Sequence, residues 1–161
     1  MTDTSRAVSA MSEAEVGEFL AAERRCHVAT LDGDGGIDLV PMAYLLWEGR
    51  LGLWTDQRSK KVRNLRRDPA ITVLVERGEI FDELRAVELR GRAQIFADLD
   101  VSRRAGEMLF GRGTPGGLSA ESRAAAVALA PERVLIVVEP DIVISWDHRK
   151  LSGLTPGQVG H

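Results

Sequence analysis

The chain has 161 residues, of which 44% are hydrophobic and 28% charged, and its formal net charge is -3. This length and composition predict one ordinary globular domain with a single core, and the acidic balance argues against a protein that binds nucleic acid over its whole surface. The lone Cys26 excludes an internal disulfide framework and a cysteine-based zinc site, and we expect it to be a buried small hydrophobic residue.

No membrane or export signal is evident in the sequence. No apolar run reaches the roughly 20 residues that span a bilayer, and the amino terminus lacks the apolar core of a signal peptide. We therefore expect a cytoplasmic protein without a membrane partner.

The first third of the chain predicts a helix followed by three strands. Residues 1–11 are small and polar, and we expect them to be disordered. Ser12 and Glu15 match a capping box, and the apolar spacing that follows predicts a helix over 12–24. A hairpin is predicted from strands at 26–31 and 37–46 around a glycine-rich turn, and a third strand from 50–55. Pro41 indicates a bulge or an edge in the second strand.

The remainder predicts further strands with helices between them. A β-branched run at 70–76 predicts a buried strand, and clear alternation at 87–95 predicts a half-buried one. In that strand the small Gly91 and Ala93 fit the inner face of a tapering barrel. Helices are expected at 98–110 and 119–130, joined by a loop that either gates a pocket or simply connects them. Two strands, 133–139 and 142–146, are expected on either side of Pro140, before a flexible tail at 152–161.

These elements together predict a mainly β fold with accessory helices. Six or more strands in hairpins, interrupted by short helices, are accommodated most economically by a closed or nearly closed antiparallel barrel. We expect this domain to occupy residues 12–151.

A strongly basic segment follows the third strand. Six of the ten residues from Arg58 to Arg67 are basic, although the whole chain is acidic. A short helix is predicted to begin near Ser59, whose hydroxyl can cap free backbone N–H groups. Lys61 and Leu65 share one face of this helix, so Lys61 is drawn towards the body of the protein. This combination favours an anionic ligand such as a phosphate, although a basic helix can also be a solvated face.

The residues Ser59, Lys60 and Lys61, followed by Asn64-Leu65 and Asp68-Pro69 directly after Leu53-Trp54-Thr55, resemble the pyridoxamine 5'-phosphate oxidase-like split-barrel family. The flavin and deazaflavin oxidoreductase branch of that family is the most similar. The resemblance implies an antiparallel split β-barrel that binds FMN or the deazaflavin coenzyme F420 in a groove between two subunits. It also implies a homodimer.

The resemblance assigns roles to particular residues. Ser59 and Lys61 would hold the cofactor phosphate, with Arg58 and Lys60 as helpers. The strand around Pro41, Met42 and Ala43 would lie against the cofactor ring. The family usually has a second proline four positions before Pro41, where this chain has Ile37. The further cofactor-binding candidates are Trp54, Thr55 and Trp146.

The sequence contains no nucleophile elbow, no HExxH motif, no Walker loop and no metal-ligand cluster. Hydride transfer fits this absence because the cofactor would carry the chemistry, and a non-catalytic binding or storage protein fits it equally. A nucleic-acid-binding barrel is the least favoured class, because no aromatic residue interleaves the basic run.

A second polar cluster lies near the end of the chain. Trp146, Asp147 and His148 combine an aromatic ring, a carboxylate and an imidazole, which would either close a pocket across a dimer interface or simply end the last strand. His148 is the one candidate proton donor for a small-molecule substrate.

Cations outside the phosphate position bear on the choice of cofactor. The positive charges near the phosphate position outnumber those that one phosphate group requires, because Arg58, Lys60 and Arg63 accompany Lys61. These additional cations would suit the longer, carboxylate-bearing tail of a deazaflavin. The sequence therefore predicts tighter binding of deazaflavin than of FMN.

Overall fold

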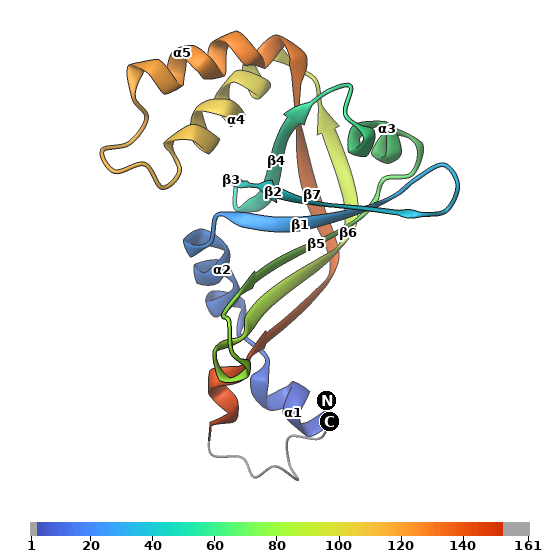
Figure 1. Ribbon diagram of the computed structural model, residues 1–161, viewed down its shortest axis with the longest axis vertical. Helices are drawn as coiled ribbons and strands as arrows, with labels where there is room; N and C mark the ends of the chain where they lie inside the picture. Colours follow the sequence, from blue (N-terminus) through green and yellow to red (C-terminus); the bar gives the residue numbers. More distant parts are fainter. Residues whose placement is uncertain (1–2, 153–161) are drawn as a thin grey trace.

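The computed structural model describes residues 3–152 (Figure 1). Seven strands form one antiparallel sheet: β1 (Arg25–Leu31), β2 (Ile37–Ala43), β3 (Leu45–Trp47), β4 (Arg50–Asp56), β5 (Ala70–Arg77), β6 (Arg85–Phe96) and β7 (Arg133–Asp147). Their order across the sheet is β2-β1-β5-β6-β7-β4-β3. Strands β2 and β3 are opposite edges, yet Tyr44 alone connects them, so the sheet must curl until its edges approach each other. The predicted mainly β, split-barrel fold class is confirmed.

Five α-helices and three short 3-10 helices accompany the sheet in the described part of the chain. They are α1 (Asp3–Ser9), α2 (Glu13–Ala22), α3 (Lys60–Arg67), α4 (Leu99–Gly111), α5 (Ala120–Leu129), η1 (Phe81–Glu83), η2 (Ala130–Glu132) and η3 (His148–Leu151). Helix α2 begins with the predicted capping box, in which Ser12 Oγ accepts from Glu15 N at 3.3 Å and Glu15 Oε2 accepts from Ser12 N at 2.7 Å. Helices α4 and α5 pack together at one end of the sheet, and α3 stands beside it (Figure 1).

The amino-terminal segment differs from the expected disordered residues 1–11. Helix α1 lies within it, close to η3 at the other end of the chain. Two hydrogen bonds fix the residues after α1: Met11 N donates to Ser145 Oγ at 3.0 Å, and Lys150 Nζ donates to the carbonyl of Ala10 at 2.9 Å. These long-range contacts explain why local composition did not predict the segment's structure. Of the tail expected at 152–161, only Ser152 belongs to the described residues.

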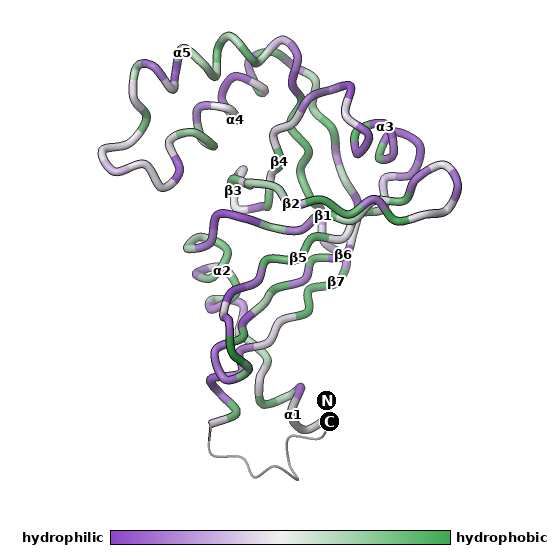
Figure 2. Tube along the Cα trace, in the orientation of Figure 1, coloured by the Kyte–Doolittle hydropathy of each residue, from purple (hydrophilic) through white to green (hydrophobic). Residues whose placement is uncertain are grey.

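The core consists of two hydrophobic clusters on opposite faces of β4 and β7. Leu53 and Ile136 belong to the first, which fills the interior of the curl, whereas Trp54 and Leu135 belong to the second, which packs under α4. Hydrophobic residues run along the central strands β5, β6 and β7 (Figure 2). Cys26 is 1% exposed, and burial raises the pKa of its thiol to about 12, which agrees with its expected role as a small hydrophobic residue.

Two predicted strand boundaries are wrong. The expected strand 37–46 is interrupted at Tyr44, where the chain passes from one sheet edge to the other. The two strands expected around Pro140 are one long strand, β7, with a register shift where Arg90 and Gly91 of β6 pair with it. A proline is tolerated at such an irregularity because no ladder hydrogen bond is needed there.

Gly91 has a different role from the barrel taper that we expected. A Cβ atom built on Gly91 would lie 2.0 Å from the carbonyl oxygen of Glu139 and 2.8 Å from the Cα of Pro140. The irregular backbone of β7 therefore occupies the space that any side chain at position 91 would need.

Candidate functional site

Ser59 lies at the start of α3, immediately after the turn that follows β4. Its backbone has the extended conformation of an N-cap residue, with φ -62° and ψ 155°. Its hydroxyl, however, makes no capping hydrogen bond, so the predicted side-chain cap is wrong. Ser59 Oγ is instead buried without a hydrogen-bond partner among the described residues. A buried hydroxyl in this condition is costly, by about 1–3 kcal/mol, unless a ligand provides its partner.

Lys61 lies one turn into the basic segment and faces the body of the protein, as predicted. The side chain is half-buried, while Leu65 on the same helical face is 3% exposed. Lys61 Nζ donates to Thr55 Oγ1 at 3.4 Å, and within the described residues no carboxylate oxygen lies within 4.0 Å of it. Burial is the largest influence on Lys61 and lowers the pKa of its ammonium group.

Charged residues from two strands influence this lysine. Asp38 of β2 and Asp56 of β4 act to raise the pKa of Lys61, and Arg133 at the start of β7 acts to lower it. The Arg133 guanidinium lies over the Trp54 ring, 4.8 Å from its centroid. The sequence analysis did not identify Asp38 or Arg133. Arg133 pairs with Asp56 across β4 and β7, and this pairing joins residues that lie far apart in the sequence. We call the group Thr55, Ser59, Lys61 and Arg133 the α3 corner.

The expected helper cations are already paired with carboxylates. Lys60 Nζ lies 3.6 Å from Asp32 Oδ2 and 3.5 Å from Asp38 Oδ1, so it links α3 to the β1–β2 hairpin. Arg58 lies 3.6 Å from Glu132 and 4.0 Å from Asp56. Both residues flank Ser59 in the sequence, but their charges are largely balanced by the protein itself.

The remaining arginines of the basic segment have different surroundings. Arg63 Nη1 donates to the carbonyl of Arg58, and Arg67 Nη2 donates to the carbonyl of Leu31 on β1. Arg66 is exposed and has no hydrogen bond or ion pair among the described residues. The basic segment therefore combines one half-buried cation, Lys61, with surface cations, most of which make hydrogen bonds or ion pairs within the protein.

The β2 strand is an edge strand, which agrees with one of the two interpretations of Pro41. Its side chains alternate, so that Asp38 and Met42 are partly buried while Pro41 and Ala43 are exposed. Met42 packs against the interior cluster. Asp38 places this strand beside Lys60, so β2 is adjacent to α3 as a cofactor groove would require.

Trp54 contacts the α3 corner through the Arg133 guanidinium that lies over its ring. Its ring belongs to the cluster under α4, its Nε1 donates to Ser102 Oγ at 2.9 Å, and it meets Phe110 edge-on at a centroid distance of 5.7 Å. The neighbouring Thr55 points to the other face of β4, where it accepts from Lys61. These contacts hold Trp54 in the packing under α4, and its expected cofactor contact stays a prediction.

Trp146 at the end of β7 and His148 in η3 belong to the carboxyl-terminal end of the last strand, which lies at the opposite end of the sheet from α3 in the same chain (Figure 1). His148 is 8% exposed, its ring lies against that of Phe81, and its Nδ1 is 2.8 Å from the Phe81 carbonyl. Because a carbonyl only accepts, Nδ1 carries the proton and Nε2 is the remaining ring nitrogen. One chain by itself does not bring His148 to the α3 corner.

Helix α4 covers the second cluster closely. A Cβ atom on Gly106 would lie 2.7 Å from the Trp54 ring, and Ser102 Oγ also donates to the carbonyl of Ala130 at 3.0 Å. The α4 helix is thus fixed to β4 through Trp54 and to η2 through Ala130.

Two further properties of the described residues concern metal ions and membranes. Residues 3–152 contain no group of three or more potential metal-ligating side chains. None of the helices in this range combines the length and the apolar character that crossing a bilayer requires.

The curled antiparallel sheet is a split barrel, and the start of α3 carries a half-buried lysine and a buried hydroxyl that has no hydrogen-bond partner among the described residues. Residues 12–147 match the family described as pyridoxamine 5'-phosphate oxidase. The chain belongs to this family of split barrels.

Solved structures give further likenesses. A conserved hypothetical protein of Mycobacterium tuberculosis, Rv2991, is 35% identical, with a TM-score of 0.85 over 91% of each chain. An F420 reductase is 25% identical, with a TM-score of 0.57 over 78% of this chain and 93% of the other. HutZ, a haem storage protein of Vibrio cholerae, shares the fold at 14% identity and a TM-score of 0.65, over 83% of this chain and 94% of the other. The search of curated proteins found no match.

Proposed function

We propose that the α3 corner holds the phosphate of a flavin-type coenzyme, either deazaflavin F420 or FMN, and that the protein is an oxidoreductase that transfers hydride to a small conjugated substrate. The observation that carries this proposal is the buried Ser59 Oγ, which has no hydrogen-bond partner in residues 3–152, two residues before the half-buried Lys61, which has no carboxylate partner in the same range. Family membership and the likeness to an F420 reductase support it.

The residues of the α3 corner fit a phosphate group. The Ser59 hydroxyl can donate a hydrogen bond, and the Lys61 ammonium provides a desolvated positive charge. Asp38 and Asp56 lie near Lys61 and oppose an anion, so the attraction must come from short contacts and not from a general positive field. A phosphate held in this way would fix one end of the coenzyme beside β2.

The chain contributes binding and orientation. A bound flavin or deazaflavin supplies the hydride chemistry, which explains why no other redox group is required. The edge strand β2, with Pro41 and Ala43 exposed, offers a face without side-chain cover for the ring system. His148 remains a candidate proton donor only if a second subunit brings it to the site.

The paired cations change the expectation about cofactor preference. Lys60 and Arg58 already have carboxylate partners, so the cationic surplus no longer favours a carboxylate-bearing tail. The likeness to an F420 reductase is the remaining support for deazaflavin over FMN. The alternative of a non-catalytic binding or storage protein shares the same corner.

Absorbance spectroscopy tests the proposal. The purified protein is incubated with FMN or with F420, passed over a desalting column and examined in the visible range. We expect one of the two cofactors to remain bound at about one per chain. Failure to retain either cofactor would contradict the proposal.

Turnover separates an enzyme from a storage protein. A reduced cofactor bound to the protein should be reoxidised faster when conjugated carbonyl compounds are added. Stable binding without any acceleration by such compounds would favour the storage alternative.

A homodimer forms part of the same proposal. Leu31, Ile37 and Leu39 of the β1–β2 hairpin are 40%, 72% and 63% exposed, an apolar surface that a second subunit would cover. We expect light scattering at micromolar concentration to give twice the chain mass. A monomer mass with cofactor still bound would contradict this prediction.

The lowered pKa of Lys61 predicts a pH dependence of cofactor affinity. Burial favours the neutral amine, so the attraction to phosphate should decline as pH rises, beginning below the ordinary lysine value of 10.5. Lys61→Arg is the control because arginine keeps its charge throughout this range. Fluorescence titration from pH 7 to 10 checks the prediction, and identical pH profiles of the two proteins would contradict it.

A further inference from the structure

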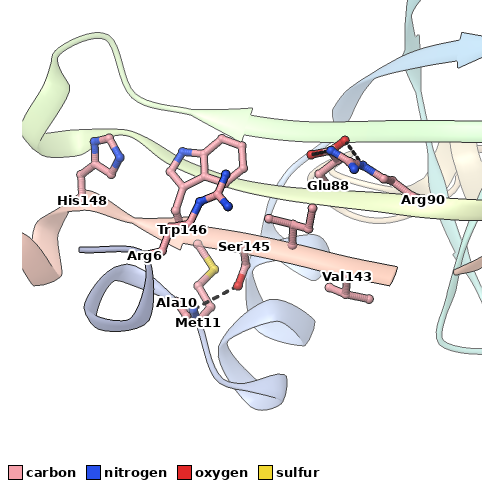
Figure 3. A pocket seen from close by; sticks show the side chains of 10 residues that line it. Arg6, Ala10, Met11, Glu88, Arg90, Val143, Ser145, Trp146 and His148 are labelled. Carbon is pink, nitrogen blue, oxygen red and sulfur yellow. Dashed lines mark hydrogen bonds and ion pairs between the residues drawn. The ribbon is translucent and has the colours of Figure 1, made fainter. Parts of the chain in front are cut away.

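A pocket lies at the other end of the sheet from the α3 corner, between the segment of α1 and strands β6 and β7 (Figure 3). Its volume is about 620 Å³, which falls within the usual range for small-molecule sites, about 300–1,000 Å³. Strand β7 contributes residues 143–146 to its lining, and Met11 forms one side. None of the residues assigned to the α3 corner contributes to this pocket.

The polar groups of the pocket are arranged along its length. Glu88 and Arg90 of β6 lie at one end and His148 at the other, while Arg6 and Trp146 lie between them (Figure 3). Arg90 Nε and Nη2 donate to the two carboxylate oxygens of Glu88 at 2.7 Å and 3.3 Å, so this pair neutralises itself. The net charge of the wall therefore comes from Arg6 and is positive.

The shape and chemistry of the wall select for one class of ligand. Trp146 provides a partly buried indole face, on which a flat ring can stack. The Arg6 guanidinium is planar and offers paired donors that match a carboxylate. The pocket is also held in place, because Met11 N donates to Ser145 Oγ at 3.0 Å and thereby joins the segment after α1 to β7.

We propose that this pocket binds a flat aromatic carboxylate, with the ring on Trp146 and the carboxylate on Arg6. Within one chain this pocket and the α3 corner share no residue, so each can be altered without changing the lining of the other.

Binding of 2-naphthoate to the full-length protein tests the proposal. Trp47 and Trp54 are 8% and 3% exposed, so quenching of tryptophan fluorescence by this probe reports mainly on Trp146. We expect saturable quenching and a calorimetric stoichiometry of one per chain. The neutral isostere 2-naphthamide should bind at least about tenfold more weakly, because it cannot form the charge-assisted contact.

Variants identify the site. Arg6→Gln should lose about tenfold in affinity for 2-naphthoate, whereas Arg103→Gln, an exposed arginine of α4 paired with Asp100 at 3.6 Å, should not change it. Val143→Glu supplies a second test, because Val143 is 50% exposed and an added carboxylate there should repel the probe without disturbing the core.

Several results would overturn the proposal. Absence of saturable binding is one, and it is also the result expected if a second copy of the chain covers the pocket. Equal affinity for the acid and the amide, or equal affinity of Arg6→Gln and Arg103→Gln, would also overturn it. Lys61→Ala should bind 2-naphthoate like the unaltered protein, so failure here is distinguishable from failure of the proposed cofactor function.

Discussion

Replacing Lys61 with alanine should weaken cofactor binding by about tenfold to a hundredfold. Lys61 is the half-buried cation of the α3 corner, and its ammonium group has only Thr55 Oγ1 as a hydrogen-bond partner among the described residues. Removing one charge-assisted contact to phosphate costs on the order of 1.5–3 kcal/mol, which corresponds to that change in affinity. Fluorescence titration with FMN and with F420 measures the effect.

Arg66→Ala is the matched control for this prediction. Arg66 belongs to the same helix and carries the same charge, but it is exposed and has no partner in residues 3–152. Arg67 is less suitable because its guanidinium binds the Leu31 carbonyl and so connects α3 to β1. Equal losses for Lys61→Ala and Arg66→Ala would show that the basic segment acts as a diffuse field.

Replacing Gly91 with alanine should destabilise the protein by more than about 3 kcal/mol, because an added methyl group would collide with backbone atoms that cannot move aside. The Cβ position lies 2.0 Å from the Glu139 carbonyl oxygen, well inside any van der Waals contact. For a chain of 161 residues this corresponds to a fall in Tm of roughly 9 °C or more. Thermal denaturation followed by circular dichroism measures the change.

Gly17→Ala is the control for the glycine prediction. Gly17 lies inside α2 with nothing within 4 Å of its Cβ position, so alanine should raise stability by about 0.5–1 kcal/mol through its higher helix propensity. A Gly91→Ala protein as stable as the parent would contradict the close approach of β6 and β7.

Local patterns predicted much of the fold and the orientation of Lys61. The capping box at Ser12, the alternation along β6 and the helix after Ser59 all depend on residues near one another in the sequence. The i, i+4 spacing of Lys61 and Leu65 correctly indicated which lysine faces the protein. These features need no knowledge of distant contacts.

Long-range contacts explain what the sequence did not predict. The carboxylates that pair with Lys60 come from the β1–β2 hairpin, and the contacts that fix α1 come from the last residues described. No local pattern contains this information. Trp54 and Thr55 are neighbours in β4 and therefore point to opposite faces of the sheet, which strand alternation alone indicates.

The central claim is that Ser59 and Lys61 bind a phosphate group, and comparing ligands with and without that group tests it most directly. Affinities of FMN and riboflavin, or of F420 and its phosphate-free deazariboflavin core, are measured for the parent protein and for Ser59→Ala and Lys61→Ala. We predict that the parent prefers the phosphorylated ligand by about tenfold or more and that each variant loses most of this preference. A preference that is unchanged in both variants would contradict the claim.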